Sequence, residues 1–369
     1  ATRTAFDDLL AELSDDGRLV HVEHLPARGE QLAGLRRPLP GPVIERLEGR
    51  ALWSHQAEAI DLVRDGHHTV IATGTASGKS LCYQLPIAEA VIDPVKPGTA
   101  LLVYPTKALA HDQLLSLTEF GFPDLVAGAY DGDASPEEKA WIRDNANVVL
   151  TNPEMLHAGL LPRHAKWDAL LMRLRYVVID ALHGLRGIFG THVAHVLRRL
   201  RRLCRHYGAD PTFVFCSATI GQPERLASAL CGAPVTAVTA DGSPRGPRRF
   251  ALLDPPVLDE ETGARSSANS EAASVTAALV ASGHRTITFC RSRKGTELVA
   301  ADVSRRLPID LRDSVVSYRA GYLADERRAI EHELFGGSLR GVVATSALEL
   351  GVDVGGLDAC VMNGFPGTI

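Results

Sequence analysis

The sequence predicts an α/β protein with two parallel sheets, each flanked by helices. Short apolar runs rich in β-branched residues alternate with helical patterns through most of the 369 residues, which is typical of parallel sheets covered on both faces. Polar residues follow the end of nearly every run, at the edge where such sheets bind ligands. Between residues 240 and 274 the composition shifts to Pro, Gly, Ser, Arg and Glu, and a second strand–helix series follows. We therefore expect two domains.

The N-terminal part of the chain is expected to form an extension, residues 1–45. It combines a short helical pattern with a Pro/Gly/Arg-rich run, and we expect it to pack on or precede the first core. The first domain would span residues 46–243 and the second residues 244–369, with a flexible loop around 259–272. A helical pattern at 47–63 contains Gln56. Its amide offers one donor and one acceptor and could pair with adenine, although such a residue is more often simply exposed on a helix.

A Gly/Ser/Thr-rich loop at residues 73–80 is the strongest local signal. It follows an apolar run at 68–72 and precedes a helical pattern at 81–91, the strand–loop–helix order of a P-loop NTPase. Backbone N–H groups of such a loop cradle phosphates, while Lys79 would reach the β- and γ-phosphates and Ser80 would hold Mg²⁺. Thr73 stands where the strict pattern has its first Gly. The alternative is a Gly-rich connector with an incidental lysine.

Further apolar runs continue the two sheets. They lie at 99–104, 147–150, 176–179 and 212–216 in the first domain, and at 286–290, 314–318, 341–345 and 359–362 in the second. The polar stretches after the first four are Pro105-Thr106-Lys107, Thr151-Asn152-Pro153-Glu154, Asp180-Ala181-Leu182-His183 and Ser217-Ala218-Thr219. The second series has no phosphate loop. We therefore expect one nucleotide site in a cleft between two similar sheets.

Composition excludes several classes of protein. No apolar run approaches the roughly 18 residues of a membrane span, and no signal peptide is visible, so a cytoplasmic location is expected. The six cysteines are scattered, which fits reduced thiols and argues against a disulfide framework or a zinc site. The net charge is −5. Any contact with nucleic acid must therefore come from local basic patches.

Taken in order, these motifs resemble those of superfamily 2 DEAD/DEAH-like helicases, from about residue 52 to residue 369. The motifs Pro-Thr-Lys-Ala-Leu-Ala, Asp-x-Leu-His and Gly-Phe-Pro-Gly-Thr-Ile look most like the MrfA-type bacterial DNA-repair helicases, relatives of a RecQ-like fungal enzyme. The resemblance implies two tandem RecA-like domains and an ATP-dependent helicase or translocase that uses ATP and Mg²⁺. It also implies single-stranded DNA as the partner and a role in DNA repair. A monomer without a membrane segment or zinc in this region is expected.

The resemblance also implies roles for individual residues, although many could be helix caps instead. Nucleotide and Mg²⁺ would be bound by Gln56, Thr75, Ala76, Ser77, Gly78, Lys79, Ser80, Gly351 and Asp353, with Ser80 and Asp180 on the metal. Lys79, Asp180, Ala181 and His183 would occupy the catalytic positions. Contacts to one DNA strand would come from Thr106, Lys107, Thr151, Asn152, Arg291, Ser292, Arg319, Thr345 and Ser346. Ser217, Ala218, Thr219 and Glu349, together with His183, would couple the two sites.

Two departures from the family pattern bear on catalysis. Ala181 stands where the family has a glutamate that orients the attacking water, so hydrolysis should fall by orders of magnitude while nucleotide binding survives. We favour an introduced Glu→Ala change that traps the ATP-bound state over a natural non-hydrolysing member. The chain also ends at Ile369, before the motif that carries the family's arginine finger. A truncated second domain is the expectation.

Three functions remain open from the sequence. The first is an ATP-driven DNA helicase or translocase that is inactive as written, in which domain closure on ATP would tighten the grip on one strand. The second is a nucleic-acid clamp that ATP gates without turnover. The third is an RNA helicase, for which binding would depend on the 2′-hydroxyl.

Overall fold

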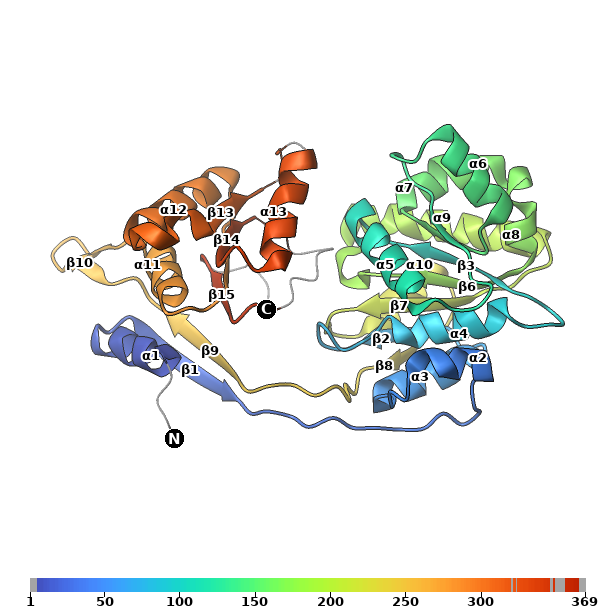
Figure 1. The fold of residues 1–369 in the computed structure, drawn as a ribbon, viewed down its shortest axis with the longest axis horizontal. Helices are drawn as coiled ribbons and strands as arrows, with labels where there is room; N and C mark the ends of the chain where they lie inside the picture. The colour runs from blue at the N-terminus through green and yellow to red at the C-terminus, as the bar shows by residue number, and fades with distance from the viewer. Residues whose placement is uncertain (1–4, 320, 323, 346–347, 349–355, 365–369) are drawn as a thin grey trace. The chain divides into compact units, whose positions relative to one another are not determined.

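A computed structural model of the chain describes residues 5–364, apart from 320, 323, 346–347 and 349–355 (Figure 1). The chain divides into two compact units. One unit is Ala27–Gly246, and the other combines Ala1–Pro26 with Pro247–Ile369. Each unit contains a parallel sheet flanked by helices. The predicted fold class is therefore confirmed.

The unit of residues 27–246 is built on a seven-stranded sheet with the order β4-β5-β3-β6-β7-β2-β8, and every neighbouring pair is parallel. Its strands are β2 (Thr69–Ala72), β3 (Thr99–Val103), β4 (Ala127–Ala129), β5 (Val148–Thr151), β6 (Leu174–Ile179), β7 (Thr212–Ser217) and β8 (Thr236–Val238). Because all strands run in the same direction, the polar residues that follow them are gathered along one edge.

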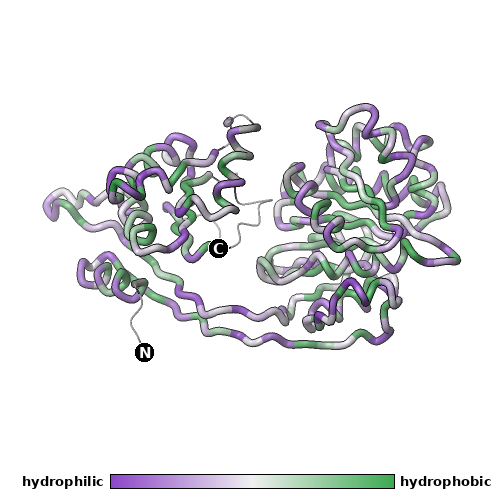
Figure 2. The backbone as a smooth tube through the Cα atoms, viewed as in Figure 1, coloured by the Kyte–Doolittle hydropathy of each residue, from purple (hydrophilic) through white to green (hydrophobic). Residues whose placement is uncertain are grey.

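Alternate residues of the central strands point into two separate apolar cores. Leu101 and Val103 of β3 belong to one core, and Ala100 and Leu102 belong to the other. Helices α3 (Ser54–Arg64), α4 (Leu81–Val91) and α5 (Lys107–Phe120) bury apolar residues in the second core, while α9 (Gly187–His206) and α10 (Pro223–Cys231) bury theirs in the first. Figure 2 shows the apolar residues concentrated along the sheet strands. Short helices complete the unit: α2 (Gly41–Ile44), α6 (Pro136–Asn145), α7 (Pro153–Met155) and α8 (Asp168–Met172).

The other unit holds a four-stranded parallel sheet with the order β13-β14-β12-β15. Its strands are β12 (Thr286–Phe289), β13 (Val315–Tyr318), β14 (Gly341–Ala344) and β15 (Ala359–Met362), and its helices are α11 (Ala268–Ala281), α12 (Arg293–Arg306) and α13 (Ala324–Gly336). Strands β10 (Val257–Asp259) and β11 (Ala264–Arg265) form a short antiparallel pair. They occupy part of the stretch that we expected to be a flexible loop, and α11 begins before that stretch ends.

The predicted N-terminal extension, residues 1–45, is divided between the two units, since Ala1–Pro26 belong to the unit that also contains Pro247–Ile369. Strand β1 (Leu19–Leu25) pairs antiparallel with β9 (Arg248–Leu253), and Leu13 of α1 (Ala5–Asp15) packs against Val275 and Leu279 of α11. Of the rest of the extension, Leu39 and Val43 are buried in a third apolar cluster of the Ala27–Gly246 unit, with Ile60 of α3 and Leu85 of α4. Pairing between strands so far apart in sequence leaves no local periodic signal, so the sequence could not show it.

Candidate nucleotide site

The loop of residues 73–80 connects β2 to α4 at the carboxyl edge of the sheet, between the ends of β7 and β8. Two residues adopt left-handed backbone conformations, Ala76 with φ 58° and Gly78 with φ 62°. A Cβ at position 78 would lie 2.5 Å from Gln56 Nε2 and 3.1 Å from the Trp53 ring. The glycine is therefore required both by its conformation and by the close approach of α3.

The lysine of the loop is bonded to the loop itself. Lys79 Nζ donates to the carbonyl oxygens of Gly74 (2.7 Å) and Thr73 (3.3 Å), and the hydroxyls of Thr73 and Ser77 are 2.6 Å apart. Ser80 Oγ donates to Gln113 Oε1 of α5 (3.1 Å). This hydrogen bond uses the proton of the Ser80 hydroxyl and leaves its oxygen lone pairs available to a cation.

The backbone amides of the loop fit a phosphate group. From Thr75 to Ser80, no backbone N–H donates to an acceptor within the described part of the chain. Consecutive unsatisfied N–H groups at the start of a helix form an anion-binding site. With the Lys79 ammonium beside them, these residues suit the phosphates of a nucleotide. Ser80 and Asp180 offer the oxygen ligands that Mg²⁺ prefers.

The side chain of Gln56 is hydrogen-bonded to the loop. It is 3% exposed, its Oε1 accepts from Trp53 N (3.0 Å), and its Nε2 donates to Gly78 O (2.9 Å). The predicted adenine contact would therefore have to use the second N–H and second lone pair of the same amide. In this structure Gln56 links the start of α3 to the phosphate loop.

Asp180 and Ala181 follow β6, next to the loop. Burial raises the pKa of Asp180, while the N–H of Ala181, which donates to its Oδ1 (2.6 Å), and the Lys79 charge act in the opposite direction. Ala181 is 5% exposed and adopts a left-handed conformation, φ 53°. Its methyl group carries no proton-accepting atom. The position next to Asp180 therefore offers no side-chain base.

Two of the predicted coupling residues, His183 and Ala218, are in contact beyond the ends of β6 and β7. The N–H of Ala218 donates to His183 Nδ1 (3.4 Å), which joins the stretch after Asp180 to the stretch after β7. Ser217 is buried, and its hydroxyl has no hydrogen-bond partner among the described residues. Thr219 is exposed. This arrangement gives a direct physical link between two of the predicted motifs.

Two further contributors to the loop's position were missed from the sequence, His55 and Asp241. His55 is fully buried, its Nε2–H donates to Ser77 O (2.8 Å), and its Nδ1 accepts from Gly242 N (3.1 Å). Asp241 Oδ2 accepts from Gly74 N (3.3 Å) and pairs with Arg28 (3.1 Å). The available signals were the position of His55 beside Gln56, and the Asp-Gly-Ser sequence shortly after a strand.

Gly242 allows this segment to approach so closely. A Cβ at position 242 would overlap Ser54 Oγ and lie 3.0 Å from the carbonyl oxygen of Gln31. The Ser243 N–H and hydroxyl both donate to Asp241 Oδ1. Burial alone would raise the pKa of Asp241, but the hydrogen bonds from Ser243, Arg28 and Gly74 lower it to about 2. We call residues 55 and 241–243 the loop clamp.

Several predicted DNA contacts of the first unit have structural partners. Thr106 caps α5 by accepting from Leu109 N, and Asn152 caps α7 by accepting from Met155 N. Lys107 Nζ pairs with Asp133 (2.6 Å). Thr151 is 1% exposed and its hydroxyl donates to Tyr130 O (2.8 Å), so its side chain is not presented to a ligand. Capping, the alternative considered from the sequence, accounts for Thr106 and Asn152.

In the other unit, three predicted contact regions follow adjacent strands. Arg291 and Ser292 follow β12, Arg319 follows β13 and Thr345 follows β14, so they lie at one edge of that sheet. Ser292 caps α12 by accepting from Gly295 N, and Arg319 pairs with Glu297 (2.6 Å). The predictions for Ser346, Glu349, Gly351 and Asp353 lie outside the described residues.

Two features are absent from the described part of the chain, a membrane-spanning helix and a cluster of metal ligands. None of its helices combines the length and the apolar character that crossing a membrane requires. No group of three or more His, Cys, Asp or Glu side chains in that part is arranged to hold a metal ion. The magnesium ligands considered above are a single carboxylate and a hydroxyl, so this second result does not concern them.

Known families match both units. The DEAD/DEAH box helicase family matches residues 53–226, and the helicase conserved C-terminal domain matches residues 271–369. Among characterised and uncharacterised relatives, the chain is 38% identical to the uncharacterised ATP-dependent helicase YprA of Bacillus subtilis, over the whole chain and 50% of that protein. It is 41% identical to the ATP-dependent helicase HRQ1 of Saccharomyces cerevisiae, over 95% of this chain and 33% of that protein.

Solved structures give the same picture. The DUF1998 helicase MrfA bound to DNA matches with a TM-score of 0.92 and 39% identity, over 98% of this chain and 49% of that chain. MrfA bound to DNA and AMPPNP matches with a TM-score of 0.91 and 38% identity, over 98% of this chain and 51% of that chain. The chain thus spans about half of the length of these structures, and half or less of the relatives above.

Proposed function

The chain belongs to the superfamily 2 helicases of the MrfA type, and from this premise we propose that it binds ATP with Mg²⁺ and grips single-stranded DNA in a nucleotide-dependent way. The observation that carries the proposal is the series of backbone N–H groups from Thr75 to Ser80 that have no hydrogen-bond acceptor among the described residues and lie beside Lys79. The match to MrfA bound to DNA and AMPPNP supports DNA as the partner. DNA repair and a cytoplasmic location are part of the proposal.

In this proposal the loop holds the triphosphate through its amides and Lys79, while Ser80 and Asp180 hold Mg²⁺, which would neutralise phosphate charge. Gln113 orients the Ser80 hydroxyl, and Gln56 contacts adenine in addition to bracing Gly78. The loop clamp keeps the amides aligned before nucleotide arrives. Preorganised donors of this kind bind without paying a reorganisation cost at the moment of binding.

Hydrolysis by the chain as written is proposed to be severely weakened. Ala181 lies directly after the metal-binding Asp180, is buried, and lacks the carboxylate that positions water in the family. Loss of a general base or positioning group typically lowers a rate by about 10²–10⁴-fold. Nucleotide binding would survive, because the phosphate-binding groups belong to the loop. The chain would then act as an ATP-gated clamp on DNA, which is the second candidate function.

The deciding experiment measures the affinity of the chain for a fluorescent single-stranded DNA oligonucleotide. The titration is run without nucleotide, with ATP and with a non-hydrolysable ATP analogue, each with Mg²⁺. We expect tighter DNA binding with either nucleotide and little difference between them. A Lys79→Ala variant is the control, in which the nucleotide effect should disappear. A DNA affinity that does not change when nucleotide is added would contradict the proposal. Tighter binding of RNA than of DNA would show that the nucleic acid bound is RNA instead.

A further inference from the structure

Helix α9 carries an unusual concentration of positive charge. It begins shortly after His183, and its 20 residues include five arginines and three histidines but no aspartate or glutamate. The whole chain has a net charge of −5. A helix without a single acid in such a chain is a local basic surface, the kind of patch that a nucleic-acid contact would require.

The charged residues are ordered along one side of the helix. Val193, Leu197, Leu200 and Cys204 are buried in the core beneath α9. The opposite side carries residues spaced by three or four positions, so they form one stripe. The α9 stripe consists of Ile188, His192, His195, Arg199, Arg202 and His206; all are exposed except Arg199, which is half-buried.

Local structure accounts for two arginines of the helix, and these lie beside the stripe. Arg198 donates to Ala229 O (3.3 Å), and Arg201 donates to Cys231 O (2.8 Å) and Gly232 O (3.0 Å). They satisfy carbonyls at the carboxyl end of α10, where cations are favoured. The remaining arginines, Arg199, Arg202 and Arg205, therefore need another explanation.

The stripe has no acidic partner among the described residues. Arg199 Nη1 lies 3.3 Å from His157 Nδ1, a basic side chain. No described ion pair involves a residue of the stripe. Its positive charge is therefore not neutralised within the described part of this unit. An anion from outside the chain would be the natural counter-charge.

The stripe adjoins two of the predicted motifs. At its amino end, α9 follows the stretch from Asp180 to His183, and Arg199 contacts His157, which follows the cap residue Asn152 by one turn of helix. Exposed Arg163 and Lys166 extend the basic surface along the segment Leu161–Lys166, which packs against α9. The acids between residues 152 and 210 are Glu154, Asp168, Asp180 and Asp210, and none of them lies within α9. The surface thus continues from the predicted single-strand contacts.

We propose that the α9 stripe, together with His157, binds the phosphate backbone of duplex DNA next to the single strand; this rests on the proposed function. A 20-residue helix is about 30 Å long, which matches roughly nine base pairs. The two arginines of the stripe, Arg199 and Arg202, lie about 5–6 Å apart between Cβ atoms, and its three histidines offer ring N–H donors. None of its six residues is Phe, Tyr or Trp, the large rings on which single-strand sites stack successive bases; the exposed Phe189 lies beside Ile188, at the amino end of the helix only. Contacts of this kind add affinity without reading sequence.

The test is the double variant Arg199→Gln with Arg202→Gln. Its affinity is compared with that of the parent chain for a DNA duplex of about ten base pairs with a single-stranded tail, and for the tail alone, over a series of salt concentrations. We expect tailed-duplex affinity to fall roughly fivefold per arginine at 0.15 M salt, and the salt slope to fall by about one per arginine. Affinity for the tail alone and for a fluorescent ATP analogue should not change.

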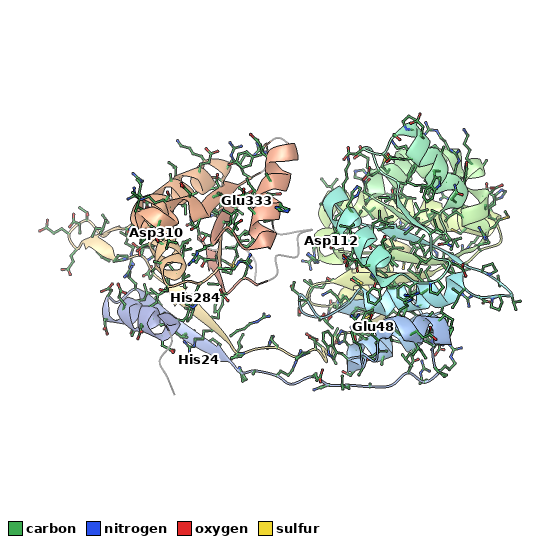
Figure 3. All side chains as sticks on the ribbon, in the orientation of Figure 1. His24, Glu48, Asp112, His284, Asp310 and Glu333 are labelled. Atoms are coloured by element: carbon green, nitrogen blue, oxygen red, sulfur yellow. The ribbon has the colours of Figure 1, made fainter. Side chains whose placement is uncertain are left out.

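A matched control removes two exposed arginines elsewhere in the same unit, Arg46→Gln with Arg50→Gln. They flank Glu48, labelled in Figure 3, beside the buried Leu47, which belongs to a different apolar cluster from the one that α9 covers. If the variant and the control bind the tailed duplex equally, the inference fails. Equal weakening on duplex and tail would also overturn it. If the parent binds neither DNA, the proposed function itself fails.

Discussion

Ala181 is the residue with the largest expected effect on chemistry. It combines a buried methyl group with a left-handed backbone, φ 53°, directly after Asp180. That backbone conformation costs a non-glycine residue roughly 1–2 kcal/mol of free energy. The backbone is therefore held there by its surroundings, including the hydrogen bond from Ala181 N to Asp180 Oδ1. The site keeps its shape while lacking a base.

We predict that Ala181→Glu raises the rate of DNA-stimulated ATP hydrolysis by about 10²–10⁴-fold, because a carboxylate can orient and deprotonate the attacking water. Affinity for an ATP analogue should change little, since the phosphate contacts lie in the loop. The rate is measured by phosphate release with saturating single-stranded DNA. Ala181→Gln is the matched control, with nearly the same shape and no basic group. Equal rates for the two variants would refute the assigned role.

Asp241 shows how one segment can set the geometry of another element. The loop is held from outside at Gly74 by Asp241 and at Ser77 by His55, and Gly242 links the two by donating to His55. These contacts join β2, α3 and the segment after β8, which are far apart in the sequence. The amides of the loop are therefore oriented by tertiary contacts as well as by the local Gly-Lys-Ser pattern.

We predict that Asp241→Asn lowers the free energy of unfolding of this unit by about 1–2 kcal/mol at neutral pH, less than the full pKa difference would give, because solvent screens a partly buried carboxyl. The pKa of Asp241 is about 2 in the folded chain, against an ordinary value of 3.8, and each pKa unit corresponds to about 1.4 kcal/mol. Since the folded pKa is the lower one, the stabilisation is present above about pH 4. It is lost as the pH falls from about 4 towards 2.

The measurement is denaturant unfolding at a series of pH values, together with the affinity for an ATP analogue. In the variant the acid part of the stability curve should be flatter, and nucleotide affinity should fall. Asp144→Asn provides the control, because Asp144 is exposed and pairs only with its neighbour Arg143 in the described structure. A variant with unchanged acid dependence and unchanged nucleotide affinity would show that the clamp does not position the loop.

The whole molecule consists of two units, and the chain passes between them twice, near residues 26 and 247. One unit is continuous in sequence. The other needs its first 26 residues, because β1 supplies the partner of β9 and Leu13 fills a cluster with Val275 and Leu279. The stability of this second unit should therefore depend on the N-terminus, while that of the nucleotide-binding unit should not.

We predict that Leu13→Ala lowers the stability of the unit formed by residues 1–26 and 247–369 by about 2–5 kcal/mol, because Leu13 is 3% exposed and its loss leaves a cavity. Calorimetry would follow the two units as separate transitions, and an ATP analogue would mark the nucleotide-binding one by raising its Tm. The matched control is Leu9→Ala, at a partly buried position on the same helix, with a smaller effect expected. A fall in the Tm of the nucleotide-binding unit would contradict the division.

The sequence by itself determined the fold class, located nine of the eleven described parallel strands, missing the short β4 and β8, and predicted the phosphate loop. Each of these features depends on residues that are close together in the sequence: β-branched runs, the Gly-Lys-Ser pattern, and polar residues at strand ends. Tertiary structure decided what those residues touch: Gln56 braces Gly78, Thr151 is buried, and His55 and Asp241 hold the loop. It also assigned the N-terminus to the second unit. Such contacts join residues that are distant in sequence, so the local pattern of apolar and polar residues cannot predict them.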